Sequence, residues 1–204
     1  MALQIAPRPE AALALVTQEL TRMATGDTFL TPRLRAARSR TLAVSTWLPS
    51  YSLILEKILV SSDLSSCCQD CGWTFLVHGP NDVLATIETC HDSFNRSALG
   101  PLREGPVVDG LVAALNQAEG ISRADGHAHQ PTLLIAAPIY LNALWLRRAD
   151  GLDWILPLPP LPPPTPLLAS QPLRPAPFVG ILRPIIQHCL ASAAERRSES
   201  ALSR

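Results

Sequence analysis

The sequence predicts an α+β fold in which several helices pack on a small mixed sheet with a C-terminal antiparallel hairpin. Three observations favour it: apolar residues recur at helical spacing in several segments, short β-prone segments lie between them, and Asp150-Gly151 divides two apolar segments as a hairpin turn would. With 204 residues, 47% of them hydrophobic, the chain is long enough for a sizeable core. We expect one core domain over residues 1–156, a proline-rich strap over 157–177, and a C-terminal helix with a frayed tail over 178–204.

The first third of the chain alternates helical and extended patterns. Leu13, Val16 and Leu20 fall on one helical face, and Gly26 marks the end of that pattern. The expected elements, in order, are a helix over 10–24, a short basic helix opened by Thr31-Pro32, a strand over 41–48, a helix over 50–60 and a polar loop over 61–71.

The middle of the chain predicts two further strands and two helices. Gly79-Pro80 and Gly100-Pro101 are the expected breaks, because glycine and proline end regular elements. Val83, Ile87 and Cys90 share a helical face after the first break. The expected elements are a strand over 73–78, a helix from 82 through 94, a helix from Pro106 that stops at Gly120, and a buried strand over 132–137.

The hairpin is the most specific structural prediction. Asp-Gly is the preferred dipeptide of a two-residue type I′ turn, and strands over 140–148 and 152–156 flank it. That turn would place Arg148 opposite Asp153, Arg147 opposite Trp154 and Leu146 opposite Ile155. Each pair is favourable across two antiparallel strands.

The strap holds ten prolines between residues 157 and 177, which favours polyproline II. Its leucines have no helical or strand periodicity, and soluble monomers seldom expose large apolar patches. We therefore expect these leucines to lie against the core or a second chain, and Pro184 to sit in the first turn of the last helix. The leucines are Leu158, Leu161, Leu167 and Leu168.

Charge and hydropathy exclude several classes of protein. The 17 basic and 17 acidic residues balance, whereas nucleic-acid binders usually carry a basic excess. The run Arg33–Arg40 is best interpreted as a solvated helix face. The longest apolar stretch, Leu133–Leu146, is interrupted by Pro138 and Asn142, so we expect no membrane span. No nucleophile elbow, glycine-rich phosphate loop or His-Glu-x-x-His motif is present.

Five cysteines, without a signal-peptide pattern, favour reduced thiols in a cytoplasmic protein. We expect Cys90 and Cys189 to be buried on apolar helix faces, and Cys67 and Cys68 to be more exposed. The alternative is a zinc site, because thiolates and imidazoles are zinc ligands. Its candidate ligands are Cys67 or Cys68, Cys71, Cys90 and His91.

His127 and His129 form a second candidate pair. Alternate residues of an extended segment point the same way, so both imidazoles could serve one metal. The segment is also polar, and a solvated loop is the simpler interpretation. We therefore expect no cofactor, with zinc as the alternative.

The low charge content and the apolar strap predict a non-enzymatic protein-interaction or assembly module that self-associates. Its partner would be a protein or a second copy, with no nucleic acid and no membrane span. The alternative is a small metal- or thiol-dependent enzyme that uses the Cys67/Cys68/Cys71 and His127/His129 clusters.

Overall fold

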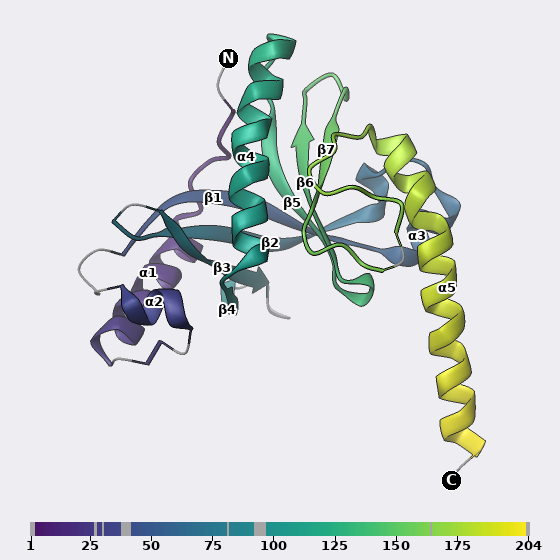
Figure 1. Ribbon diagram of the computed structural model, residues 1–204, viewed down its shortest axis with the longest axis horizontal. Helices are drawn as coiled ribbons and strands as arrows, with labels where there is room; N and C mark the ends of the chain where they lie inside the picture. Colours follow the sequence, from purple (N-terminus) through teal and green to yellow (C-terminus); the bar gives the residue numbers. More distant parts are fainter. Residues whose placement is uncertain are drawn as a thin grey trace.

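The computed structural model describes residues 3–26, 28–29, 31–37, 42–80, 82–91, 97–163 and 165–202, with the backbone alone for 193–202. These residues form a seven-stranded mixed sheet in the order β4-β3-β2-β1-β5-β6-β7 (Figure 1). Neighbouring strands are antiparallel except β1 and β5, which are parallel. The strands are β1 (Ala43–Leu53), β2 (Cys68–His78), β3 (Val83–His91), β4 (Ser97–Arg103), β5 (Gln130–Ala136), β6 (Leu141–Arg147) and β7 (Trp154–Leu158).

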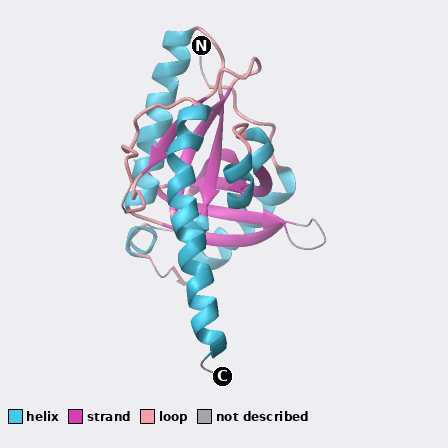
Figure 2. Cartoon of the chain, turned by 90° about the vertical axis from the view of Figure 1, so that its right-hand side faces the viewer, coloured by secondary structure: helices cyan, strands magenta, loops and turns pink. Residues whose placement is uncertain are grey.

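The helices cover both faces of this sheet. In Figure 1, α4 lies in front of the strands, and in the side view of Figure 2, α5 crosses the sheet from top to bottom. No helix in the described part of the chain is both long and apolar enough to cross a membrane. The helices are α1 (Glu10–Thr25), α2 (Pro32–Ala36), α3 (Leu55–Val60), α4 (Pro106–Asp125) and α5 (Pro175–Leu202), with short 3-10 turns η2 (Ser65–Cys67) and η3 (Ala137–Ile139).

The predicted small sheet is wrong, because the sheet is large. The helix expected from 82 through 94 is replaced by β3 at Val83–His91, residues 92–94 lie outside the described residues, and the expected break at Gly100-Pro101 lies inside β4. The helical spacing of Val83, Ile87 and Cys90 was misleading, because β3 is rich in β-branched residues that favour strands. The helix expected over 50–60 is likewise divided between the end of β1 and α3.

The 140–156 hairpin is present, but its register differs by one residue from the prediction. Leu146 pairs with Trp154 rather than Ile155. The Gly151 N–H donates to the Arg148 carbonyl (3.0 Å), and Gly151 adopts φ +78°. Residues 148–151 therefore form a turn whose last residue, Gly151, is in the left-handed conformation. Asp150-Gly151 is not the centre of a two-residue type I′ loop. The Asp153 carboxylate accepts the Arg148 backbone N–H (2.8 Å) in place of a strand partner.

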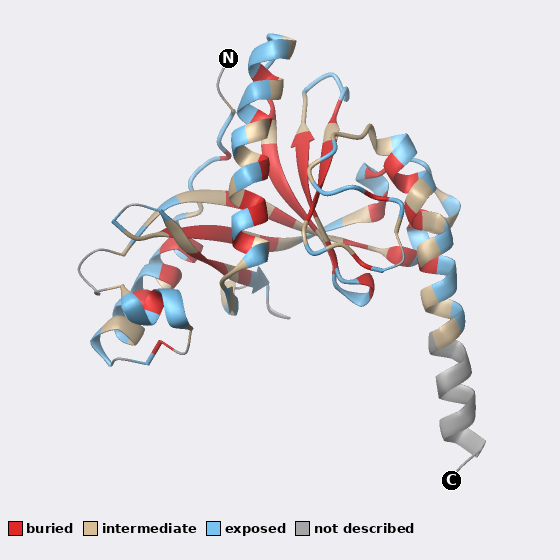
Figure 3. Ribbon diagram, viewed as in Figure 1, coloured by how far each residue is buried: buried red, intermediate tan, exposed pale blue. Residues whose placement is uncertain are grey.

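Three apolar clusters hold the layers together, and Figure 3 shows the buried residues along the strands and the helices that cover them. One lies between α4 and the strands β1, β2, β5, β6 and β7. The other two lie on the opposite face: α1 and α2 pack on β2 and β3, and α3 and α5 pack on β5, β6 and β7. The fully buried centres of the three clusters are Leu144, Phe75 and Trp145, respectively.

The strap folds back on the edge of the sheet. Leu173 and Ile155 exchange backbone hydrogen bonds of 2.8 and 2.9 Å, so the strap covers the outer edge of β7. Leu158 and Leu167 are buried and Leu161 is half-buried, all within this chain, whereas Leu168 is 62% exposed. Of the four strap leucines, Leu168 alone is exposed, so the other three need no second chain to cover them.

Candidate interaction surface

An apolar groove lies where η3, the strap and α5 meet. Its volume is about 380 Å³, and none of its lining residues carries a permanent charge. We call it the strap groove. Its lining residues are Ile139, Tyr140, Pro162, Pro163, Pro166, Ile181, Pro184, Ile185, His188 and Cys189.

Tyr140 is a highly exposed part of this surface. The residue is 83% exposed, although it is aromatic. Its backbone has φ 53° and ψ 36°, the left-handed region, where it turns the chain from η3 into β6. That conformation costs a residue with a side chain about 1–2 kcal/mol, and glycine or asparagine usually occupies it. A bulky aromatic ring is therefore held on the surface in a strained position.

The α5 wall of the groove is fixed by contacts on both sides of the helix. Leu182 and Ile186 are fully buried against the sheet. The Arg183 guanidinium donates to the backbone carbonyls of Ile58 (3.1 Å) and Ser61 (3.0 Å), which ties α5 to α3. These contacts set the rotation of α5, so that half-buried Ile181 and Ile185 line the groove. The prediction that Pro184 sits in the first turn of the last helix is wrong, because α5 begins at Pro175 and Pro184 lies inside it.

The predicted burial of the cysteines is wrong. Cys67, the last residue of η2, is fully buried in the cluster on the α5 side of the sheet, whereas Cys90 is exposed and Cys189 is half-buried. The reason is the strand in place of a helix at 83–91. Cys90 falls near the end of β3, outside the apolar cluster that Ile87 joins.

The cysteine cluster is only partly brought together. Cys71 and Cys90 lie on adjacent strands, β2 and β3, and the His91 Nε2 atom is 3.5 Å from Asp70 Oδ1. Cys67 belongs instead to the α5 side of the core. Among the described residues, no group of three or more His, Cys, Asp or Glu side chains is arranged to hold a metal ion.

The thiols of β2 are poor nucleophiles at neutral pH. Burial, followed by the neighbouring Cys67, raises the pKa of the Cys68 thiol to about 12. Burial, followed by the charges of Asp70 and Glu88, raises the pKa of the Cys71 thiol to about 11. A reactive cysteine needs the opposite shift, because the thiolate is the nucleophile and the metal ligand.

The two histidines of the 127–129 segment do not face one site. His127 is exposed, whereas His129 is fully buried. The His129 Nδ1 atom lies 3.0 Å from the Ser122 hydroxyl, and its Nε2 atom lies 3.6 Å from the Asp125 carboxylate. Ser122 is also fully buried, whereas the Asp125 side chain is 27% exposed, so the serine and the histidine have no access to a substrate.

The arginine run is engaged in the fold over its described part. The Arg33 guanidinium pairs with the Asp109 carboxylate on α4 (2.6 and 2.8 Å). The backbone N–H groups of Arg33 and Leu34 donate to the Glu104 carboxylate, which caps α2. Arg38 and Arg40 lie outside the described residues. The described part of the run therefore joins α2 to α4.

Sequence reasoning missed the strap groove. Its walls come from residues 139–140, 162–166 and 181–189, and no local pattern indicates that these segments meet. The one available signal was Tyr140, an aromatic residue after Ala-Pro-Ile at the junction of two apolar segments.

With this geometry in view, comparison with known proteins adds no assignment. No protein-family model, curated protein or solved structure matches the chain.

Proposed function

We propose that this chain is a non-enzymatic protein-interaction module that self-associates through the strap groove. One observation carries the proposal: Tyr140 is 83% exposed and strained at the rim of an uncharged groove walled by prolines and isoleucines. Conformational strain in a native fold tends to be kept at functional positions. Tyrosine is also among the residues that contribute most to protein interfaces.

Self-association is supported because one surface carries both an exposed aromatic ring and a wall of prolines. Aromatic rings and prolines recognise each other in peptide-binding grooves, and this groove supplies both. In a two-fold dimer the same patch of each copy meets its counterpart. The Tyr140 ring of each copy then enters the proline wall of the other.

We also propose that the module works in the cytoplasm. All five cysteines are free thiols, and free cysteines persist in reducing compartments. A nucleic-acid partner is not part of the proposal, because the basic and acidic residues balance and Arg33 is paired within the chain.

The alternative, a metal- or thiol-dependent enzyme, has less support. The raised pKa values of Cys68 and Cys71 oppose thiolate chemistry. His127 is exposed whereas His129 is buried, so the two imidazoles do not face one site. Elemental analysis with a thiol titration tests it directly. Stoichiometric metal, or one thiol of abnormally high reactivity at pH 7, would favour the enzyme.

Sedimentation velocity over a concentration series tests the dimer. We compare Tyr140→Asn, which keeps the left-handed backbone accessible, with Leu152→Asn, which removes another exposed apolar side chain at the far end of β6. We expect Tyr140→Asn to weaken association at least tenfold and Leu152→Asn to leave it unchanged. A wild-type chain that stays monomeric at the highest concentration would contradict the proposal.

A further inference from the structure

The first half of β1 has an unpaired edge. β2 pairs with β1 from Ala43 to Leu53, with a bulge at Ser45, but on the other side β5 pairs only with Ser50–Ser52. Among the described residues no backbone group bonds to Ala43–Pro49 on that side. Unpaired N–H and C=O groups in a row are a template for another strand.

The N-terminal arm limits the length of this edge. The Gln4 N–H donates to the His129 carbonyl (2.9 Å), and the Ala6 carbonyl accepts from Trp47 Nε1 (3.0 Å). The arm therefore reaches β1 at Trp47 before it enters α1. Within the described part of the chain, the length of this edge that has no backbone partner is Ala43–Thr46.

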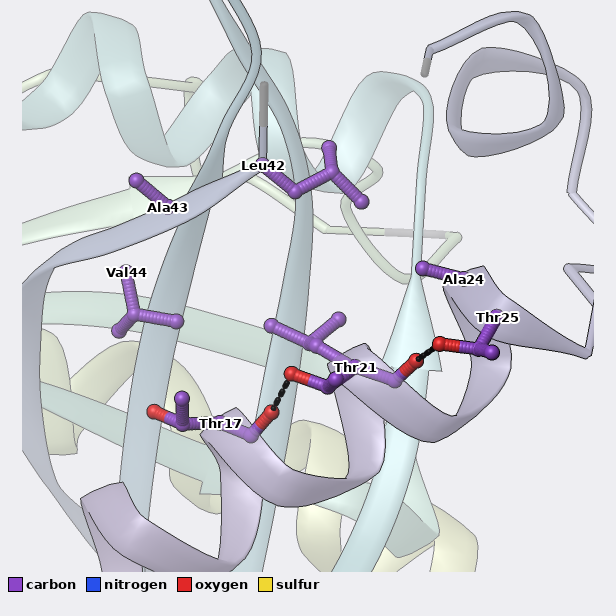
Figure 4. Close-up of a pocket in the computed structure, with 8 residues that line it drawn as sticks. Thr17, Thr21, Ala24, Thr25, Leu42, Ala43 and Val44 are labelled. Carbon is purple, nitrogen blue, oxygen red and sulfur yellow. Dashed lines mark hydrogen bonds between the residues drawn. The ribbon is translucent and has the colours of Figure 1, made fainter. Parts of the chain in front are cut away.

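Helix α1 lies opposite the open edge and leaves a groove between them (Figure 4). The space is about 250 Å³, and a second space of about 500 Å³, lined by Arg8 and α1, shares Thr17 and Thr21 with it. We call the whole the β1 groove. Its lining includes Leu20, Ala24, Leu42 and Val44, and it ends at the ion pair of Arg8 with Glu10.

Three threonines one helical turn apart form the helix wall. In Figure 4 the hydroxyls of Thr21 and Thr25 turn back on the helix, where they donate to the carbonyls of Thr17 and Thr21 (2.8 Å each). The hydroxyl groups of Thr21 and Thr25 therefore already donate within α1 and have no second proton to donate to a ligand. The wall therefore offers small, largely apolar side chains, while the strand wall offers free backbone groups.

We propose that the β1 groove binds an extended segment of another protein, which adds as a strand to Ala43–Thr46 and lies against Thr17, Thr21 and Thr25. Main-chain hydrogen bonds to a free edge select a β-strand, and alternate side chains select the sequence. Every second side chain of the bound segment faces the pocket at Leu20 and Val44, so these side chains are apolar and uncharged. Because α1 forms the second wall, a single chain fits where the edge of a second folded sheet does not.

This inference concerns a surface separate from the strap groove and does not depend on self-association. The probe is a pool of capped octapeptides in which threonine alternates with valine, leucine or phenylalanine. Matched peptides with central prolines lack the required N–H donors. Amide chemical shifts of the ¹⁵N-labelled full chain report the binding.

We expect the alternating peptides to shift the amides of residues 43–46 and of Thr17 and Thr21, and to slow their hydrogen exchange. Thr21→Arg should weaken this binding at least tenfold, because it fills the groove. Ala11→Arg adds the same side chain at an exposed position of α1 outside the groove and should leave binding unchanged. Tyr140→Asn should also leave it unchanged.

Any of four outcomes would overturn the proposal. The edge amides do not respond to any peptide, the proline peptides bind equally well, or Thr21→Arg binds like the wild type. A shift of residues 43–46 with protein concentration alone would also overturn it, because a second copy would then be the occupant.

Discussion

At the scale of single residues, burial decides what each polar group can do. His129 and Ser122 are both fully buried and bonded to each other, whereas His127, two residues away, is exposed. A His-x-His pattern specifies a shared direction only if the segment is a regular strand, and β5 begins after this pair, at Gln130. The imidazole of His129 is therefore part of the core, where its protonation is coupled to stability.

The pKa of His129 is lowered, first by burial, with the Asp125 carboxylate opposing the shift and the Arg148 guanidinium adding to it. The folded chain thus prefers the neutral imidazole. Its contribution to stability is present above the ordinary histidine pKa of about 6.5, and is lost as the pH falls through that value towards the lowered pKa of the folded state. We expect the free energy of unfolding to fall below pH 6.5 by at most about 1.4 kcal/mol per pH unit from this group.

Urea denaturation at several pH values between 7 and 5 measures the effect. His129→Gln keeps a hydrogen-bonding side chain without a titrating ring, so its stability should depend less on pH than that of the wild type. His127→Gln, at an exposed position, should keep the wild-type pH dependence. Equal slopes for His129→Gln and the wild type would show that His129 does not titrate in this way.

At the scale of helices and strands, α4 shows how closely the strap is packed. A Cβ atom at Gly110 would lie 2.6 Å from the Cδ and Cγ atoms of Pro159. At Gly120, further along the same helix, a Cβ atom would meet nothing within 4 Å. The two glycines therefore have opposite roles: Gly110 allows a close approach, and Gly120 only lowers helix propensity.

We expect Gly110→Ala to destabilise the chain by about 1–3 kcal/mol, because the added methyl group overpacks the contact with Pro159. Gly120→Ala should stabilise it by about 0.5–1 kcal/mol through better helix propensity alone. Denaturation midpoints of the two variants give both values. If both substitutions were stabilising, the strap would not be held against α4 as described.

The elements also show what the sequence could predict. The helix expected over 10–24 is confirmed as α1, because the pattern of Leu13, Val16 and Leu20 fits a helix. In β3, by contrast, Val83, Ile87 and Cys90 fit a helix, whereas alternate residues Ala85 and Ile87 fit a strand. Pairing with β2 decides between them.

The strap groove could not be predicted from periodic sequence patterns, for a different reason. Ile139, Pro163 and Ile185 are each unremarkable in their own segments, and they become one surface only when α5 returns to the η3 end of the sheet. The conformation of Tyr140 depends on the same tertiary context. Local periodicity carries no information on such an arrangement.

At the scale of the whole molecule, the sheet has two halves joined by a narrow seam. β1 and β5 pair through three residues on each strand, Ser50–Ser52 with Leu133–Ile135. On the α5 side the α3–α5 cluster crosses the seam, because it includes Leu53 from one half and Leu134 and Trp145 from the other. The α4 cluster crosses it on the opposite face, because it includes Leu48 and Leu76 from one half and Leu144 and Leu156 from the other. Helix α4 therefore couples the halves on one face, as the α3–α5 cluster does on the other.

We expect the two halves to unfold together. The four tryptophans report on them separately, since Trp47 and Trp73 lie in β1 and β2 and Trp145 and Trp154 lie in β6 and β7. In the double variants Trp47→Phe/Trp73→Phe and Trp145→Phe/Trp154→Phe, fluorescence and far-ultraviolet circular dichroism should give the same urea midpoint. Leu111→Ala removes a fully packed side chain from the α4 cluster and should lower the stability reported by each pair by the same amount, about 2–5 kcal/mol. If Leu111→Ala lowered the stability reported by only one pair of tryptophans, the two halves would unfold separately at the seam between β1 and β5. The strap groove and the β1 groove would then lie on parts of the chain that open independently.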